Sequence, residues 1–484
     1  MANRHQNRVF PVQRLRPALK LLDLSALSVS SVAPIFSVAA TGALLVQVAG
    51  DAVIWAIILV ALPFLVSSWL FLVLNRSFPH AGASYHWGRR IIGWDYSNFQ
   101  SWIISMAYLW SIPPILIPAA TLTLSVVGIR QPRAVWICVT AGLWTALAAI
   151  VLLYGVKVTA RVTRLFLAGE AMSVMLMGIW GGLTWRHVRD PFTVWRPPSH
   201  WSGVLVAMVL AATIVDGWEI DSYAAEESVK PRAAPGWGGI IGAAMVVLYY
   251  LVIWPILLHE VPMGTLAHSP DVLITWSHRA APPLADILRV AVLASTAGSL
   301  WLTTYILSRA LYAMARDRVM PRGLGALNRH QVPTWAVVVP LALAFTVTCG
   351  QFVWPFLHHL FPLVLGTAGF FLVGEFWLDG VNALAFVWRF RDEVRMKMSR
   401  YGRWTMLSAA VWVVLTLGFL EVLFLVWGPH YIGSGIDQVV LLILVAGVGR
   451  LAWLKYRSAQ TMVSAFEKEL NLSAEACQAQ GEYR

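Results

Sequence analysis

The chain has 484 residues, of which 58% are hydrophobic and only 12% are charged, with a formal net charge of +12. A soluble domain carries about 25% charged residues, so this composition excludes an ordinary soluble protein and indicates a polytopic membrane protein. Most of the positive charge lies in short segments between long uncharged runs, where it orients membrane spans, so we expect no nucleic-acid partner. The three cysteines lack the spacing of a metal or redox site and are expected to be packing or tail residues.

The uncharged runs predict twelve membrane-spanning helices. The first run, Leu24 to Gly50, is too long for the core of a signal peptide and is expected to remain in the membrane. A run of 45 uncharged residues ending at Gly374 is too long for one helix and is expected to turn near Gln351–Pro355. The predicted spans lie at about 24–50, 52–74, 96–128, 134–156, 165–185, 202–228, 236–259, 284–313, 330–351, 355–388, 404–427 and 436–454.

The positive residues orient these spans. With a cytoplasmic N-terminus, 29 of the 36 Lys and Arg residues fall at the two termini or in the even-numbered loops. This asymmetry satisfies the positive-inside rule. It predicts a multi-pass protein of the plasma or inner membrane, partnered by the lipid bilayer, with both termini cytoplasmic. The predicted parts are a cytoplasmic segment 1–20, helices one to five at 21–195, helices six to ten at 196–390, helices eleven and twelve at 391–457, and a cytoplasmic tail at 458–484.

The first span contains the sequence Ser-Val-Ser-Ser-Val-Ala-Pro, which ends at Pro34. Proline removes a backbone donor and clashes with the preceding turn, so it frees carbonyl groups around Ser30 and Ser31. Those carbonyls and the serine hydroxyls are suited to an ammonium group or a cation. An ordinary proline kink, with the serines bonded back to their own helix, is the alternative.

The sixth span places Asp216, Gly217 and Glu219 where hydrocarbon is expected. A carboxylate at that depth costs roughly 2.5–3.5 kcal/mol on insertion scales, and glycine weakens a helix. The segment Ala212–Arg232 is therefore predicted to be a broken helix that lines a cavity. Together with the break in the first span, it predicts the place where a substrate binds.

Four further observations carry a family resemblance. The relevant stretches, in chain order, are Pro79-His-Ala-Gly-Ala-Ser-Tyr85, Tyr154-Gly-Val-Lys-Val-Thr-Ala-Arg161, Asp216-Gly-Trp-Glu219 with Glu226-Glu-Ser-Val-Lys-Pro-Arg232, and Ser308-Arg-Ala-Leu-Tyr-Ala-Met-Ala-Arg-Asp-Arg-Val-Met-Pro321. They resemble the motifs of the amino acid-polyamine-organocation superfamily, the amino acid permeases. The resemblance implies an all-α polytopic membrane protein with a five-plus-five inverted repeat of the leucine-transporter type and two extra C-terminal helices.

The resemblance also implies a substrate site at the two breaks. The positions carried over are Ser30, Ser31, Val32 and Ala33 at the first break and Val215, Asp216 and Gly217 at the sixth, with Glu219 beside them. Trp218 is expected either to form a wall or gate of this site or to pack between helices. Tyr108 and Trp301 lie on the third and eighth helices, which flank the site in this fold, although packing or lipid contact would also explain them.

Two departures from the family pattern bear on the substrate. The first break has Ser-Ser-Val-Ala-Pro in place of the glycine-rich sequence of many members, so binding of a substrate carboxylate there is not assured. Asp216 stands where many members have a neutral residue. A carboxylate at that point favours a cationic group, so amines or basic amino acids are expected, unless Asp216 pairs with the backbone or a neighbouring helix.

Other acids are candidates for coupling. Glu170 lies where several relatives have a lysine that replaces a sodium ion; it could carry a proton, complete a cation site with Ser295 or Thr296, or form a structural hydrogen bond. Glu375 and Asp379 share one helical face and could form a gate or proton path, with Asp379 expected to pair with arginines. The charged residues Glu226, Glu227, Lys230, Arg232, Arg316 and Asp317 could form latches between loops, but solvated pairs are the default expectation.

These features predict a secondary transporter, a symporter or exchanger, for amino acids or related amines. We expect it to work by alternating access, without a bound cofactor or metal and with H⁺ or Na⁺ as the coupling ion. A channel or substrate sensor on the same fold is one rival. An intramembrane enzyme is another, but the histidines concentrate in loops and no catalytic pair is evident. The sequence leaves open the substrate, the direction of transport and whether the protein forms a homo-oligomer.

Overall fold

The computed structural model describes residues 15–129, 131–184, 195–198, 201–353, 360–390 and 399–456. The first 14 residues, the turn predicted near Pro355 and the tail from residue 457 lie outside these ranges. The chain forms two compact units, Met1–Asp437 and Gln438–Arg484. The second contributes most of the apolar helix Ile436–Tyr456 to the described part, and the candidate site described below lies in the first.

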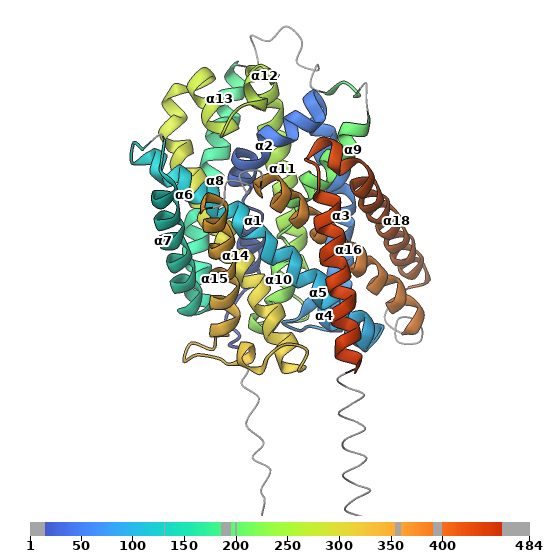
Figure 1. Ribbon diagram of the computed structural model, residues 1–484. Coiled ribbons are helices and arrows are strands. Elements are labelled where there is room, and N and C mark those ends of the chain that lie inside the picture. The colour runs from blue at the N-terminus through green and yellow to red at the C-terminus, as the bar shows by residue number, and fades with distance from the viewer. Residues whose placement is uncertain are drawn as a thin grey trace, which may run out of the picture. The chain divides into compact units, whose positions relative to one another are not determined.

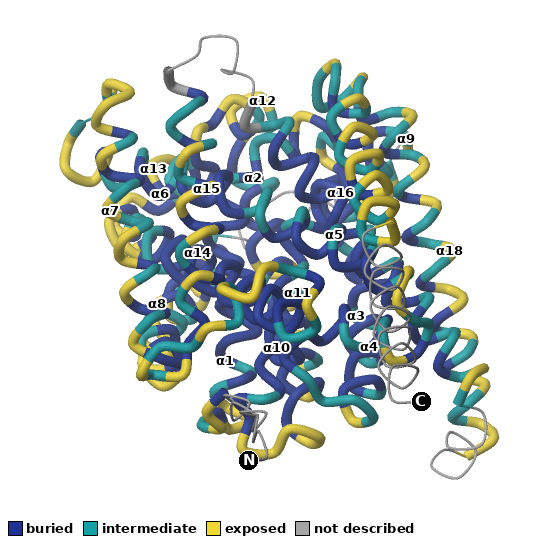
Figure 2. The backbone as a smooth tube through the Cα atoms, turned by 60° about the horizontal axis from the view of Figure 1, so that its bottom comes forward, coloured by how far each residue is buried: buried dark blue, intermediate teal, exposed yellow. Residues whose placement is uncertain are grey.

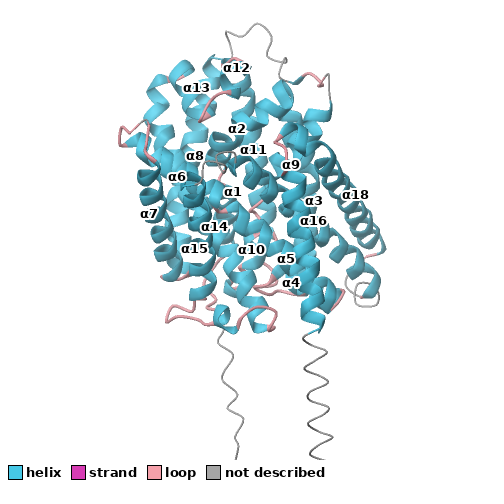
Figure 3. Cartoon of the chain, viewed as in Figure 1, coloured by secondary structure: helices cyan, strands magenta, loops and turns pink. Residues whose placement is uncertain are grey.

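The first unit is built from helices (Figures 1 and 3). They are α1 Leu21–Val32, α2 Pro34–Ala49, α3 Val53–Ser77, α4 Ala83–Ile91, α5 Trp94–Ser111, α6 Pro113–Val126, α7 Ala134–Leu153, α8 Val156–Thr184, α9 Trp201–Val215, α10 Ile220–Tyr223, α11 Trp237–Glu260, α12 Met263–Ala267, α13 Val272–Ala280, α14 Ala285–Arg316, α15 Thr334–Val353, α16 Leu360–Arg389 and α18 Arg400–Tyr431. No strand occurs in the described ranges, only two isolated β-bridges.

Ten stretches of the described chain are long and apolar enough to cross a membrane, and the shorter apolar helix α9 comes in addition. The first of the ten, Leu21–Ser77, contains α1, α2 and α3. The expected all-helical, multi-pass class is therefore confirmed. Helices α12 and α13 lie at one end of the bundle and α4 and α10 towards the other (Figure 1), and we refer to these as the α13 end and the α4 end.

Burial divides the helices into central and peripheral ones (Figure 2). In the apolar stretch that contains α14, 83% of the residues in its membrane-spanning part are buried, against 28% in α8 and in α18. The exposed side chains of α18 include Leu415, Phe419 and Val422, which suit a surface that faces lipid. Helix α14 is consequently a core helix that is enclosed by protein on nearly every side, apart from exposed residues near its start such as Ile287 and Val290.

The predicted break in the first span is present between α1 and α2. Proline disfavours the α conformation of the residue before it, and Ala33 adopts φ 50° and ψ 62°, in the left-handed region. Pro34 then begins α2, a position where the missing N–H costs nothing. The chain thus leaves one helix and enters another within a single residue.

The predicted break in the sixth span is present as well. Helix α9 ends at Val215, and the chain resumes only as the short helix α10 and a 3₁₀ turn at Ala225–Glu227. Gly217 has φ 109°, a conformation open to glycine. Tyr250 of α11 donates a hydrogen bond to the carbonyl of Ile214, which the end of α9 leaves free.

Candidate functional site

The two breaks are in direct contact. The hydroxyl of Ser28 donates a hydrogen bond of 2.9 Å to the carbonyl of Trp218. A Cβ atom added to Gly217 would lie 3.0 Å from the backbone of Ser31 and Val32. Only glycine permits this close approach of two backbones, so residue 217 joins the two interrupted helices.

A polar cavity of about 60 Å³ lies beside this contact. Its lining comes from both breaks and from the helices that surround them: Ser31, Val32, Phe36, Ser37, Ala40, Thr41, Tyr108, Ser111, Pro114, Ile115, Thr213, Ile214, Asp216, Gly217, Ser299, Thr303, Ile306, Leu365 and Ala368. One water molecule needs roughly 10–15 Å³ of such space, so the cavity has room for a few waters. A larger solute requires the lining to move.

Five of the predicted site residues line this cavity, namely Ser31, Val32, Tyr108, Asp216 and Gly217. The hydroxyl of Ser31 is buried and has no hydrogen-bond partner in the described part of the chain. The half-buried carboxylate of Asp216 receives no hydrogen bond from another described residue, and Glu219 and Glu375 are its electrostatic neighbours. The cavity therefore offers a hydroxyl and a carboxylate that the described residues leave without a hydrogen-bond partner.

Three residues predicted at the breaks, Ser30, Ala33 and Val215, do not line the cavity. Glu219 does not line it either, and its carboxylate accepts hydrogen bonds from the backbone N–H of Gly217 at 2.8 Å and from the hydroxyl of Tyr108 at 2.9 Å. It thereby fixes the shape of the second break and the position of a cavity tyrosine.

The two predicted tryptophans lie away from the cavity. Trp218 is fully buried, and its ring centroid lies 5.1 Å from that of Phe71 and 5.3 Å from that of Phe376. The indole N–H of Trp301 donates to the hydroxyl of Thr163 at 3.0 Å, so this side chain points towards α8. For both, the structure shows the packing that was the alternative expectation.

Several cavity residues are absent from the sequence prediction. They include two pairs of hydroxyl side chains spaced four residues apart, Ser37 with Thr41 on α2 and Ser299 with Thr303 on α14. Such a spacing places two side chains on one helical face. That periodicity within otherwise apolar helices is the signal that could have revealed them.

Glu170 and Ser295 meet at the start of α2. One carboxylate oxygen of Glu170 accepts hydrogen bonds from the N–H of Ile35 at 3.0 Å and from the hydroxyl of Ser295 at 2.6 Å. The other oxygen is buried without a partner in the described structure. A helix N-terminus favours a negative group, which explains why a glutamate can lie at the start of α2. Thr296 instead donates to the carbonyl of Val292 at 2.6 Å and does not join the pair.

Glu375 and Asp379 lie on α16 near the second break. The hydroxyl of Tyr223 donates to Glu375 at 2.6 Å. Asp379 accepts hydrogen bonds from Ser84 at 2.7 Å, Gln100 at 3.1 Å and Asn382 at 3.0 Å. Within the described ranges Asp379 forms no ion pair with the expected arginine, and the side chains of Ser84 on α4 and Gln100 on α5 lie against it instead.

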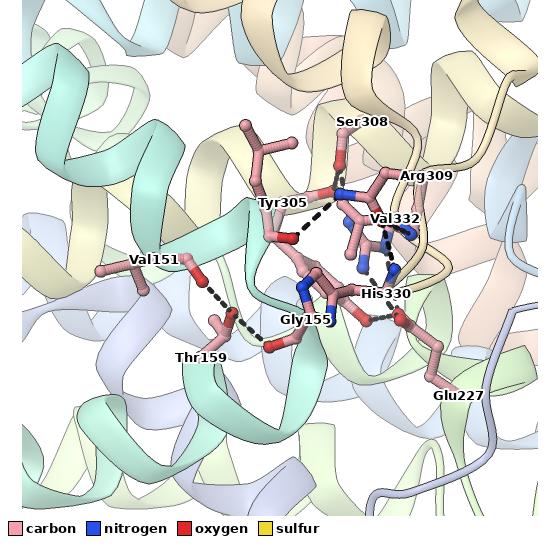
Figure 4. A network of polar contacts seen from close by, with 11 residues as sticks. Val151, Gly155, Thr159, Glu227, Tyr305, Ser308, Arg309, His330 and Val332 are labelled. Carbon is pink, nitrogen blue, oxygen red and sulfur yellow. Dashed lines mark hydrogen bonds and ion pairs between the residues drawn. The ribbon is translucent and has the colours of Figure 1, made fainter.

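Ion pairs join the segment after α10 to α14 at the α4 end. Glu227 and Arg309 form a two-point contact of 2.9 Å and 3.0 Å, with side chains only 2% and 1% exposed. Tyr305 also bonds to Glu227, and its ring lies beneath the guanidinium of Arg309 (Figure 4). Glu226 pairs with Arg316 at 2.6 Å. The buried Glu227–Arg309 pair departs from the default expectation of solvated pairs, whereas Glu226 and Arg316 are partly exposed and Lys230 and Arg232 are exposed.

Two stacked histidines adjoin the Glu226–Arg316 pair. The ring centroids of His80 and His86 are 3.8 Å apart. Burial lowers the pKa of His80 from 6.5 to about 2, assisted by His86 and Arg316. Burial likewise lowers the pKa of His86 to about 4. Both imidazoles are therefore neutral in the folded protein at neutral pH and remain so well below pH 6.

Replacing both histidines by glutamine is expected to make the protein more resistant to acid. Below about pH 6.5 the unfolded state protonates His80 and His86 while the folded state does not, so these residues lower the free energy of unfolding as pH falls. Melting temperatures of wild type and double variant, measured from pH 7.5 to 5, should diverge in favour of the variant. Parallel curves would contradict the pKa assignment.

The fold and the cavity define a class: a multi-pass membrane protein with a polar cavity where two discontinuous helices meet, as in carriers of small solutes. The chain belongs to the amino acid permease family, whose profile matches residues 19–448. It is therefore an amino acid transporter, and family membership points away from an enzyme.

Two relatives illustrate the similarity. The chain is 23% identical over 457 residues to the branched-chain amino acid permease BcaP of Lactococcus lactis, which covers 88% of this chain and 90% of the relative. It is 29% identical over 119 residues to human solute carrier family 7 member 13, which covers 25% of each. The resemblance seen in the four sequence motifs is thus confirmed.

Proposed function

We propose that the protein is a secondary active transporter that moves amino acids or related amines across the cell membrane by alternating access. The observation that carries this proposal is the cavity between the two breaks, which combines backbone from both breaks with hydroxyls and one carboxylate. Helix breaks supply unpaired backbone groups to a zwitterionic solute without exposing them to lipid. Symport and exchange are both compatible with this geometry.

We further propose twelve spans, with a five-plus-five inverted repeat followed by two helices, and both termini in the cytoplasm of the plasma or inner membrane. The breaks support the repeat, because α1–α2 form the first predicted span and α9–α10 the sixth. The two elements would then occupy equivalent places in the two halves. The excess of Lys and Arg in the even-numbered loops supports the orientation.

The proposed motion opens the two ends of the bundle in turn. At the α13 end, a cavity of about 520 Å³ shares Ala40 with the cavity at the breaks and is also lined by Asp271 and Arg289. At the α4 end, the Glu226–Arg316 and Glu227–Arg309 pairs tie the segment after α10 to α14. Release of a substrate at the α4 end would require these ion pairs to separate, so the two pairs hold this end closed.

We propose a lean towards cationic substrates because of Asp216. Its carboxylate faces the cavity without a partner among the described residues, and no Lys, Arg or His is among the cavity-lining residues. A carboxylate in such a site attracts an ammonium or guanidinium group strongly, since the surroundings screen poorly. This preference differs from the branched-chain substrates in the name of the Lactococcus relative.

The Asp216→Asn variant is expected to lose basic amino acids or amines selectively. A hydrogen bond to a charged group contributes about 1.5–3 kcal/mol, which corresponds to a loss of roughly tenfold to a hundredfold in affinity. Affinity can be followed by ligand-induced thermal shift of the purified protein and by competition for uptake. Thr303→Val, which alters the same cavity without a charge, is the control. Equal losses for neutral and cationic ligands in Asp216→Asn would contradict the cationic lean.

Reconstitution into proteoliposomes tests the transport class itself. Saturable uptake of an amino acid or amine that is accelerated by the same solute inside the vesicle identifies a carrier. Binding without flux identifies a sensor, and flux that neither saturates nor shows counterflow identifies a channel. Either of the last two results would reject secondary transport.

A further inference from the structure

We propose that Glu375 and Asp379 of α16 form a proton-binding pair that couples transport to a pH gradient. The inference rests on the proposed transport function and adds the identity of the coupling ion and of the residues that carry it. Four observations support it: burial of both carboxylates, the absence of a cationic partner, a connection to the cavity and a connection to the α4 end.

The first support is burial without a counter-charge. Glu375 and Asp379 are 0% and 2% exposed and lie one helical turn apart. The ionisable groups that interact with Glu375 are Asp379, Glu219, Asp216 and the tyrosines Tyr108 and Tyr223, and none of them is a cation. No Lys, Arg or His in the described ranges forms an ion pair with either carboxylate. Two adjacent buried carboxylates cannot both remain charged without a cation, so the pair retains a proton.

The free oxygen of Glu375 gives the proton a position. One oxygen accepts the hydrogen bond from Tyr223, and the other is buried without a partner in the described chain. By contrast, both oxygens of Asp379 accept hydrogen bonds from Ser84, Gln100 and Asn382. Those donors stabilise Asp379 as a carboxylate, so Glu375 is the member of the pair that holds the proton.

A polar path connects Glu375 to the cavity. Tyr223, which donates to Glu375, has its ring centroid 6.1 Å from that of Tyr108. Tyr108 lines the cavity, donates to Glu219 and is also an electrostatic neighbour of Glu375. Tyr108 therefore lies between Glu219 and Glu375. Movement of a substrate within the cavity shifts this tyrosine, which links occupancy of the cavity to the protonation of Glu375.

Asp379 connects the pair to the α4 end. Ser84 belongs to α4, a short helix between two membrane-spanning stretches, and Gln100 lies on α5. The hydroxyl of Tyr96 donates to the backbone of Leu378 at 2.6 Å on the same side. Carboxyl, hydroxyl and amide groups thus continue from Glu375 to a helix outside the spans. A proton released by Glu375 passes to Asp379 and leaves at this end.

The other helices packed against α16 add no cation to the pair. Helices α6 and α9 contain no ionisable side chain, and Arg76 of α3 is exposed. On α4, Arg89 pairs with Asp317 at 3.3 Å, and neither His86 nor Arg90 forms an ion pair with Glu375 or Asp379. On α18, Arg400 is exposed, and Arg403 forms no ion pair with either carboxylate within the described ranges. On α18, Glu421 faces Gly374, where an added Cβ would lie 3.4 Å from its carboxylate, but it is not among the groups that interact with Glu375.

The test uses the full chain in proteoliposomes with an imposed pH gradient of either polarity. For one proton per substrate, one pH unit is about 1.4 kcal/mol and supports at most about tenfold accumulation. Wild type is expected to accumulate substrate under one polarity. Glu375→Gln and Asp379→Asn are expected to abolish that accumulation and to retain counterflow, because the cavity is unchanged and both substitutions keep an oxygen for the Tyr223 or Ser84 hydroxyl.

Two matched variants complete the design. Glu421→Gln removes another acid buried against α16 that does not interact with the pair, and it should retain gradient-driven accumulation. Glu170→Gln removes the acid at the start of α2, and this variant should also retain gradient-driven accumulation. Loss of coupling in Glu170→Gln, together with full coupling in Glu375→Gln, would assign the proton to Glu170 and overturn the inference.

The two levels of the proposal fail in different ways. A wild type without counterflow for any amino acid or amine would reject the transport function itself. A wild type with counterflow but no response to either pH gradient would leave transport intact and reject proton coupling. Accumulation driven by a sodium gradient alone would also leave transport intact and reject proton coupling.

Discussion

Replacing Arg309 by methionine is expected to lower the free energy of unfolding by about 3–5 kcal/mol, the range measured when one partner of a buried ion pair is removed. Arg309 is 1% exposed, and its guanidinium makes two hydrogen bonds to Glu227. Without it, the carboxylate of Glu227 stays buried, and among the described side chains only the hydroxyl of Tyr305 still donates a hydrogen bond to it (Figure 4). Thermal and denaturant unfolding of the purified protein measures the change.

The neighbouring ion pair supplies the control. Arg316 and Glu226 form the same two-point contact at the same end of the bundle, but their side chains are 22% and 20% exposed. Because water screens such a pair, Arg316→Met is expected to cost about 1 kcal/mol or less. Both substitutions remove one positive charge from the same end, so an effect on membrane orientation would be common to the two variants.

A double variant separates the buried charge from the loss of packing. In Arg309→Met with Glu227→Gln, the glutamine still accepts the hydrogen bond from Tyr305 but carries no charge. Most of the lost stability should return, because the main penalty in the single variant is the unpaired carboxylate. A double variant as unstable as Arg309→Met would show that the geometry of the guanidinium, rather than charge pairing, stabilises this end.

The sequence was sufficient to locate the two helix breaks because each has a local cause. Pro34 acts on its own helix and on the residue before it, and Asp216 with Gly217 interrupts an apolar run. The multi-pass class and the family could be predicted for a similar reason, since uncharged runs and short motifs are properties of contiguous residues.

The choice of helix face on α14 could not be predicted in this way. Amphipathic periodicity reveals a buried face only when another face is exposed, and α14 is enclosed on nearly every side. The prediction named Trp301 because the eighth helix flanks the site in the family fold, whereas Ser299 and Thr303 line the cavity and Trp301 points towards α8.

The partners of the charged residues could not be predicted from the sequence either. Arg309 meets Glu227 from 82 residues away, and Asp379 meets Ser84 from 295 residues away. Such contacts depend on how the helices pack in three dimensions. Charge alone suggested an arginine for Asp379, and only the packed fold shows that hydroxyl and amide groups occupy that place.

The second large effect is expected at residue 217. Gly217→Ala should reduce substrate affinity and uptake by roughly tenfold to a hundredfold, because the added methyl group would lie 3.0 Å from the backbone of Ser31 and Val32 and push the two breaks apart. Such overpacking costs about 1–3 kcal/mol. Uptake into proteoliposomes, corrected for the amount of folded protein, measures the loss.

Gly93 provides the matched control for this substitution. Its φ of 135° is also in the region that favours glycine, but an added Cβ would meet nothing within 4 Å. Gly93→Ala therefore carries the conformational strain without the contact between the breaks, and it should lower stability while retaining affinity. If the two variants lose transport equally, backbone strain alone explains the effect, and the contact of Gly217 with the first break is not needed for binding. A loss confined to Gly217→Ala places the substrate where the two interrupted helices meet.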